Sequence, residues 1–274
     1  GVTGLADALI MCGVRYGSSE AVDLTETWMK NLRDTAYRES TQLAREKGAF
    51  QLFDAEAYMK GPNIKILPKD IQEDIKEFGI RNALLTSIAP TGTISLLADN
   101  VSSGVEPVFA FKYERTVLRP DGSKSIEPVH DYAYQMYLNL KGDTKSLPEA
   151  FVSAHSLRPE DHLVMQSTVQ KYIDSSISKT INCPENISFE DFENIYQKAY
   201  DLGCKGCTTY RPNKITGSVL STNSDVSEKE HSAGISKSYH DDNNIISMSA
   251  PLDRPAGLDG KTYKIKWPES DHAI

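Results

Sequence analysis

Apolar residues recur with helical spacing in three segments near the start of the chain, and each segment ends at a glycine: Gly13, Gly48 or Gly79. The second segment begins at Ser18 or Ser19, where a hydroxyl can cap the free amides of a helix. The apolar stripe of this second segment consists of Trp28, Met29, Leu32, Ala36 and Leu43. The pattern predicts three helices, over residues 5–12, 18–47 and 69–78.

The period of the pattern changes near residue 83. Residues 83–89 form a short, nearly continuous apolar run, which is typical of a strand buried on both faces of a parallel sheet. Pro90 ends this run, and a helix is predicted to begin just after Gly92.

Short strands and helices alternate further along the chain. Strands are predicted over residues 109–114, 177–181 and 204–210. Helices are predicted after His130, from near Pro159, and from Ser188 to Leu202. This alternation indicates an α/β protein with a mostly parallel sheet.

Residues 221–250 are rich in Ser, Asn, Asp, Glu and Lys and poor in large apolar side chains. This composition predicts a flexible polar linker that separates residues 1–220 from residues 251–274. The chain begins inside an apolar segment without an initiator Met, and a strand-like pattern over 261–268 has no following strands to pair with. We therefore expect a piece of a longer protein.

The composition narrows the classes of function. Hydrophobic residues make up 39% and charged residues 25% of the 274, which suffices for one large core or two smaller ones. The net charge of −8 argues against nucleic acid as a partner, although a few backbone amides can still bind a phosphate. No apolar run approaches the roughly 20 residues that span a bilayer, so no membrane partner is predicted. Four cysteines are too few for a disulfide framework, and we expect a cytoplasmic protein with reduced thiols.

The strongest local signal for chemistry is the segment of Pro90, Thr91, Gly92, Thr93, Ile94 and Ser95, where the predicted strand gives way to a helix. A helix N-terminus presents unpaired amides, and its dipole favours an anion. Up to three hydroxyls are expected to converge there, while Gly92 permits a backbone that other residues avoid. The segment is either a cradle for a phosphate or diphosphate, or a turn whose hydroxyls cap the helix. The local pattern alone favours the cap.

The cysteine and histidine pairs do not predict a metal site. Cys204 and Cys207 form a lone C-x-x-C, and on a strand their side chains would point to opposite faces, which disfavours a disulfide or a shared metal. His155 and His162 flank a predicted helix start, where roles on the surface and in capping are expected. No metal ligand is therefore assigned.

Two further positions could serve a site. Glu106 places a carboxylate at a strand entrance, where it either orients a ligand or holds the amides of the neighbouring loop. Tyr210 and Arg211 close the last predicted strand, at the edge where α/β folds gather functional groups. A structural tyrosine with a surface arginine is an equally good interpretation of that pair.

Several separated blocks resemble the large-subunit barrel of ribonucleotide reductases. These blocks are GVTGLADAL, RYGSSEA, Arg81-Asn82-Ala83 with the following APTGTIS, SSGVEPVF, SKTIN at 178–182, and GCKGCTTYRP. They occur in the family's order over roughly residues 1 to 220, and their joint agreement is more specific than any one motif. The resemblance implies the C-terminal part of a ten-stranded α/β barrel, in which Pro90 to Ser95 bind the substrate phosphates.

The resemblance also bears on catalysis. The family's radical-bearing cysteine, with a companion asparagine and glutamate, is implied to lie upstream of this chain. No Asn-x-Cys-x-Glu occurs in the 274 residues, and Asn182-Cys183-Pro184-Glu185 has the wrong spacing. No catalytic residue is therefore assigned in this chain, and Glu106 and Tyr210 are the candidates for supporting the substrate site.

The blocks are most similar to the class II enzymes, which make their radical directly from adenosylcobalamin. Class I large subunits carry two adjacent tyrosines on the last strand, where this chain has Thr208 and Thr209. The activity implied is that of a ribonucleoside-diphosphate reductase, with a ribonucleoside di- or triphosphate as substrate and a thioredoxin- or glutaredoxin-type reductant.

The resemblance further implies a homodimer in the full-length enzyme. Residues 260–266 are similar to the entry of a small C-terminal appendage, which would occupy residues 251–274. Two alternatives remain open: a class I large subunit that needs a metal-bearing partner subunit, and a half-barrel binding protein without catalysis.

Overall fold

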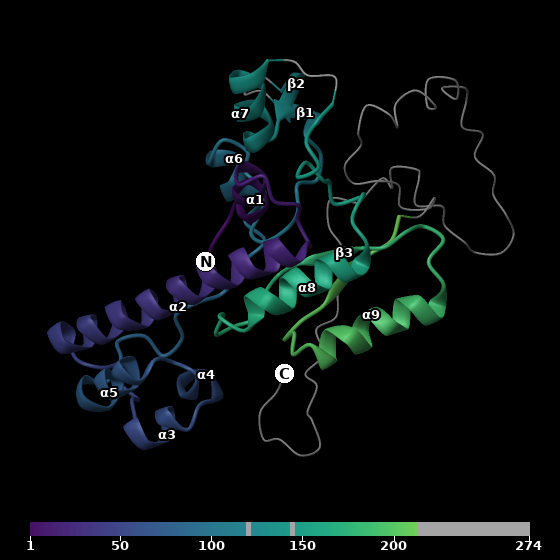
Figure 1. Ribbon diagram of the computed structural model, residues 1–274. Coiled ribbons are helices and arrows are strands. Elements are labelled where there is room, and N and C mark those ends of the chain that lie inside the picture. Colours follow the sequence, from purple (N-terminus) through teal and green to yellow (C-terminus); the bar gives the residue numbers. More distant parts are fainter. Residues whose placement is uncertain (119–121, 143–145, 213–274) are drawn as a thin grey trace, which may run out of the picture. The chain divides into compact units, whose positions relative to one another are not determined.

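The computed structural model describes residues 1–118, 122–142 and 146–212 (Figure 1). The helices are α1 (Leu5–Met11), α2 (Ser19–Lys47), α3 (Ala55–Met59), α4 (Pro62–Lys65), α5 (Lys69–Phe78), α6 (Gly92–Leu97), α7 (Tyr132–Lys141), α8 (Pro159–Gln170) and α9 (Phe189–Asp201). The strands are β1 (Lys112–Leu118), β2 (Lys124–His130), β3 (Thr180–Asn182) and β4 (Thr208–Tyr210). The predicted linker at 221–250 and the appendage at 251–274 lie outside the described residues.

The three predicted N-terminal helices are confirmed as α1, α2 and α5. Ser18 caps α2, because its hydroxyl oxygen accepts a hydrogen bond from the amide of Ala21 at 3.1 Å. The same helix ends at Gly48, whose φ of 80° lies in the left-handed region that glycine adopts without strain. No described helix has the length and apolar character needed to cross a membrane.

The buried face of α2 differs from the predicted apolar stripe. Met29 is buried as predicted, but the other four stripe residues are only half-buried. The buried face instead includes the polar residues Thr25, Arg33 and Tyr37. The guanidinium of Arg33 lies 5.0 Å from the centre of the Tyr172 ring, and α2 packs against both α5 and α8 (Figure 1). The prediction was wrong here because polar side chains that find partners can occupy the buried face of a helix.

The predicted strand at 83–89 is an extended segment rather than a regular strand. It forms one parallel bridge, between Ile88 and Ile177, and the amide of Ser178 donates to the carbonyl of Ile88 at 2.9 Å. Thr86 and Ile88 are buried, whereas Leu84 is 68% exposed. Burial on both faces is therefore wrong for this segment, because the described residues cover only one of its faces.

Asp174 fixes the start of this extended segment. One carboxylate oxygen accepts hydrogen bonds from the amides of Leu85 at 2.8 Å and Thr86 at 3.1 Å. The other oxygen accepts the hydroxyl of Tyr37 at 2.6 Å, and burial raises the pKa of that tyrosine far above its ordinary value. The chain thus enters the segment before Pro90 from a fixed position.

The predicted parallel pairing is confirmed for β3 and β4, where Ile181 lies opposite Thr209. Both strands are shorter than predicted: β3 begins at Thr180 and β4 at Thr208. The backbone before β4 bonds to helix α8 instead of a strand, since the Gly206 carbonyl accepts from the side-chain amide of Gln166 at 2.7 Å. The prediction of a strand over 204–210 was therefore wrong for its first half.

The remaining predicted strand belongs to an antiparallel hairpin. It begins at Lys112, later than predicted, and pairs along its length with β2, so that Lys112 lies opposite His130. The three later helices are confirmed as α7, α8 and α9. Asp131 caps α7 through the amide of Tyr134, and Ser188 caps α9 through the amide of Asp191.

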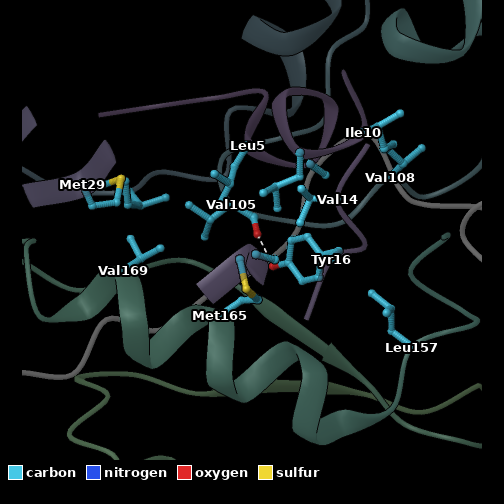
Figure 2. Packing of buried hydrophobic residues seen from close by; sticks show 14 of the residues in the cluster. Leu5, Ile10, Val14, Tyr16, Met29, Val105, Val108, Leu157, Met165 and Val169 are labelled. Atoms are coloured by element: carbon cyan, nitrogen blue, oxygen red, sulfur yellow. Dashed lines mark hydrogen bonds between the residues drawn. The ribbon is translucent and has the colours of Figure 1, made fainter. Parts of the chain in front are cut away.

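The largest apolar cluster joins α1, α2 and α8 to the loop around Val105 (Figure 2). Met165 and Val169 of α8 pack in this cluster together with Leu5 of α1. Tyr16 lies among them with its hydroxyl donating to the carbonyl of Val105 at 2.6 Å, which fixes the loop that leads to Glu106 (Figure 2). Two smaller clusters lie around Ile71 and Ile75, and around Ile181 and Ile195.

Candidate functional site

A pocket of about 490 Å³ is the candidate site. This volume lies in the range of small-ligand sites. The pocket is lined from α6, from the loop that precedes β1, and from β3. The residues that contribute polar atoms or glycine backbone are Gly92, Ser95, Asn100, Ser102, Ser103, Glu106, Tyr113, Asp131, Thr180 and Asn182.

The predicted phosphate segment reaches this pocket through Gly92 and Ser95. The left-handed backbone lies at Thr91, with φ of 52°, and not at Gly92. A Cβ atom added at Gly92 would meet nothing within 4 Å. The predicted need for an unusual backbone at Gly92 is therefore wrong, and the open space beside it is the feature that a side chain would fill.

The hydroxyls of this segment do not all converge. The Thr91 hydroxyl lies 3.1 Å from that of Thr3, and the Ser95 hydroxyl donates to the Gly92 carbonyl at 2.9 Å. Thr93 is exposed, as are Pro90 and Ile94. The side chain of Thr91, at the N-cap, makes no capping hydrogen bond, so the first amides of α6 are left without a side-chain cap.

Glu106 is held in place through both of its carboxylate oxygens. Oε1 accepts from the amide of Thr180 at 2.5 Å, and Oε2 accepts from Nζ of Lys179 at 2.9 Å. The side chain remains 25% exposed and lines the pocket. Of the two sequence interpretations, the structure thus shows Glu106 holding an amide, but the amide belongs to β3 and not to the neighbouring loop.

Lys179 lies directly behind Glu106 with no exposed side-chain surface. Its Nζ makes three hydrogen bonds: to Glu106, to Nδ1 of His162 at 2.9 Å and to the Thr180 carbonyl at 3.2 Å. An ammonium has three protons, so each has a partner. Burial lowers the pKa of Lys179, and the nearby Glu106 carboxylate opposes that shift.

The sequence analysis missed Lys179, although a signal was present. Ile177, Lys179 and Ile181 alternate along the predicted strand 177–181, and all three are buried. A lysine on the apolar face of a strand needs a charged partner within the fold. Glu106, already singled out, is that partner.

His162 is completely buried, so the expected role on the surface is wrong. Desolvation and the neighbouring Lys179 lower the pKa of His162 to about 3, which keeps the ring neutral. Because Lys179 donates to Nδ1, the proton of the neutral ring is on Nε2, which is buried. His155 is exposed, with its ring centre 4.9 Å from that of Phe109.

Asp131, one of a pair of buried carboxyl groups, lines another part of the pocket. Asp7 of α1 accepts from the amide of Ser102 at 2.5 Å and from that of Ala133 at 2.9 Å. Asp131 lines the pocket beside it, and burial together with the charge of Asp7 raises the pKa of Asp131 to about 7. A proton shared by such a pair relieves the repulsion between two negative charges.

The C-x-x-C lies away from these groups in an apolar cluster. Cys204 and Cys207 are half-buried free thiols that pack on the same cluster as Cys183, so the predicted opposite orientation is wrong. The error follows from the strand, which begins only after Cys207. Burial raises the pKa of all three thiols. Among the described residues, no group of three or more His, Cys, Asp or Glu could hold a metal ion.

Tyr210 is not among the residues that line the pocket. It lies opposite Asn182 in the pairing of β3 and β4, and its carbonyl accepts from the amide of Cys183 at 2.8 Å. Asn182 does line the pocket, so Tyr210 is one strand away from it. Arg211 is exposed.

Residues 1–210 match the family described as ribonucleotide reductase, barrel domain, and the chain belongs to this family. The chain is 34% identical, over 84% of its length, to a vitamin B12-dependent ribonucleoside-diphosphate reductase of Thermoplasma acidophilum. It is also 34% identical over 81% of its length to such a protein of Mycobacterium tuberculosis, and 26% identical over 81% to a vitamin B12-dependent ribonucleotide reductase of Streptomyces coelicolor. The matches cover 30%, 32% and 28% of these relatives, so the chain spans about a third of their length.

Proposed function

We propose that this chain is the C-terminal part of the barrel of a class II ribonucleotide reductase. The enzyme converts a ribonucleoside diphosphate to the 2'-deoxyribonucleotide by a radical mechanism with adenosylcobalamin. The observation that carries the proposal is the pocket, which contains Gly92 and Ser95 of the phosphate segment within a chain of this family. The names of the relatives, vitamin B12-dependent ribonucleoside-diphosphate reductases, support both the cofactor and the diphosphate form of the substrate.

The substrate diphosphate binds at the N-terminus of α6. The first amides of a helix have no partner within it, and the Thr91 side chain does not cap them. Charge-assisted hydrogen bonds from such amides to a phosphate each contribute about 1.5–3 kcal/mol at most. Pro90 to Ser95 form the cradle, with Gly92 leaving open the space that the phosphate fills.

Glu106 and Tyr210 support this site without providing the cradle. Glu106 fixes β3 beside the pocket through the amide of Thr180. Tyr210 pairs with Asn182, a residue that lines the pocket. The extended segment before Pro90, which forms a parallel bridge to Ile177, and the parallel strands β3 and β4 are proposed to belong to the ten-stranded α/β barrel.

We expect adenosylcobalamin to dock on other surfaces of the enzyme, where it would supply the radical that starts the reaction. The radical-bearing cysteine, with its asparagine and glutamate, is proposed to lie upstream. The residues described here bind and orient the substrate.

Thr208 and Thr209 favour class II over class I, because they occupy the positions proposed for the two tyrosines of the class I radical relay. No metal-bearing partner subunit is then needed. The complete enzyme is proposed to be a cytoplasmic homodimer that is re-reduced by a thioredoxin- or glutaredoxin-type dithiol.

An activity assay tests this function. A purified reductase that carries this chain is given CDP and a dithiol, with and without adenosylcobalamin, and dCDP is quantified. We expect dCDP only when adenosylcobalamin is present and without any second protein subunit. A requirement for a metal-bearing subunit would support class I instead. Absence of dCDP under both conditions, from a protein that is folded and binds adenosylcobalamin, would contradict the proposed function.

A further inference from the structure

The pocket presents carboxyl groups where a polyanion is proposed to bind. Its described lining includes Glu106 and Asp131 but no lysine, arginine or histidine. An uncompensated carboxylate beside a diphosphate would repel it, because charges in a partly buried pocket are weakly screened. A positive group that does contact this lining is Lys179, which is hidden behind Glu106.

We infer that Lys179 is a specificity-determining positioning residue, which neutralises Glu106 so that the pocket accepts the phosphates of a nucleotide. The inference rests on the proposed function. Lys179 does not touch the pocket itself; it acts through Glu106, whose Oε2 is 2.9 Å from its Nζ. The Lys179–Glu106 pair has no net charge, so Glu106 presents a fixed carboxylate to the pocket without adding a net negative charge.

The surroundings of Lys179 direct its charge toward Glu106. Its other two partners, Nδ1 of His162 and the Thr180 carbonyl, are uncharged acceptors. The ring of Tyr16 lies 5.8 Å from Nζ and adds a face that attracts a cation. Glu106 is thus the one carboxylate among the described hydrogen-bond partners of this ammonium.

The neutral state of His162 is part of this arrangement. A second positive charge beside Lys179 would push the ammonium toward its neutral form and leave Glu106 unbalanced. The burial of His162 prevents this, since it disfavours the charged ring, and the neutral ring can accept a hydrogen bond from Nζ at Nδ1. The histidine therefore places the lysine without competing for its charge.

A purely structural role for Lys179 makes a different prediction. If Lys179 and Glu106 only hold β3 and the loop together, removal of either residue weakens the binding of all ligands alike. If charge is decisive, removal of the two partners has opposite effects on a polyanion and little effect on an uncharged nucleoside. CDP and cytidine form a suitable pair of probes, because they share the nucleoside and differ by the diphosphate.

The test uses a reductase that carries this chain, with calorimetric titration of CDP and competition by cytidine. We expect Lys179→Met to weaken CDP binding by about tenfold and cytidine binding by less than about twofold. Glu106→Gln should leave CDP binding equal to or tighter than wild type. The double variant Lys179→Met/Glu106→Gln should restore CDP affinity to within about threefold of wild type.

Lys198→Met is the matched control, since Lys198 pairs with Glu160 at 3.1 Å with both side chains 53% exposed. It should leave both affinities unchanged. Equal losses for CDP and cytidine in Lys179→Met, or weaker CDP binding in Glu106→Gln, would overturn the inference. If Lys179→Met does not fold, Glu106→Gln and the double variant decide by the same criteria. Wild-type protein that fails to bind CDP would instead count against the proposed function.

Discussion

Two groups of polar side chains among the described residues have opposite surroundings. Behind the pocket, Lys179 and Glu106 are ionisable groups that form hydrogen bonds to each other and to the backbone of Thr180. Around the C-x-x-C, Cys204 and Cys207 pack on the side chains of an apolar cluster. Burial lowers the pKa of the lysine but raises that of the thiols, which keeps both thiols in their unreactive protonated form.

This contrast shows that the reactivity of a motif depends more on its surroundings in the fold than on its amino-acid sequence. The C-x-x-C attracts attention in the sequence, yet burial raises the pKa of both thiols and so disfavours the thiolate that redox chemistry needs. Lys179 attracts none, yet it contacts a carboxylate that lines the pocket.

The largest effect is expected from Gly92→Val in a reductase that carries this chain. The new side chain projects into open space beside the proposed phosphate position, so CDP binding should weaken by about tenfold or more, roughly 1.4 kcal/mol. Strain is not the cause, because Gly92 has no positive φ. Calorimetric titration measures the change. Binding of adenosylcobalamin serves as the control and should stay nearly unchanged. If the variant bound CDP with wild-type affinity, the segment would be a helix cap and not a phosphate site.

The next effect concerns pH and the carboxyl pair. The pKa of Asp131 is about 7, well above that of an unfolded aspartate near 4, so the folded protein retains a proton that the unfolded chain releases. The stability from this proton is fully present below about pH 4 and is lost as pH rises through about 7. Asp131→Asn keeps the N-cap but cannot lose a proton.

Relative to wild type, Asp131→Asn should therefore gain stability as pH rises. The difference in free energy of unfolding should grow by on the order of 1 kcal/mol between about pH 5.5 and 7.5. Denaturant titration at both pH values measures it. Parallel pH profiles for the two proteins would show that Asp131 does not carry this proton.

A smaller loss is expected from Thr93→Val. The exposed Thr93 hydroxyl has no role in holding α6, and the neighbouring amides remain for the phosphate. CDP binding should weaken by about threefold, or roughly 0.6 kcal/mol. An effect as large as that of Gly92→Val would move the centre of the cradle onto this hydroxyl.

The smallest effect is expected at the thiols. Joint replacement of Cys204 and Cys207 by Ala or Val should cost less than about twofold in turnover with dithiothreitol as reductant, because the thiols serve as small apolar groups. Activity is measured beside CDP binding and a folding assay. Loss of turnover with folding and binding intact would make the C-x-x-C catalytic and erase the contrast between the two regions.

The sequence predicted the longer helices well because their signals are local, but it did not predict the short helices α3 and α4. Ser18, Asp131 and Ser188 cap helices within a few residues of their own positions, and Gly48 ends one. Strand limits were predicted poorly because they depend on distant partners. The start of β4 is one example, where Gln166 of α8 takes the carbonyl of Gly206.

The site divides in the same way. The segment 90–95 and Glu106 could be identified as candidate site residues because turn residues and the order of motifs can be recognised in the sequence itself. Lys179 was missed although its place among buried residues was a signal, and the role of His162 could not be assigned because it depends on a contact with Lys179, which is distant from the helix of His162 in the sequence. Asp131 was missed for the same reason: its pKa depends on Asp7, which is distant in the sequence.

The central claim is that the pocket beside α6 binds the substrate diphosphate, and a crystal structure with CDP tests it most directly. In a reductase that carries this chain, we expect the diphosphate within hydrogen-bond reach of the first amides of α6, with the Lys179–Glu106 pair intact behind it. A diphosphate bound at another site, with this pocket empty at saturating CDP, would contradict the claim.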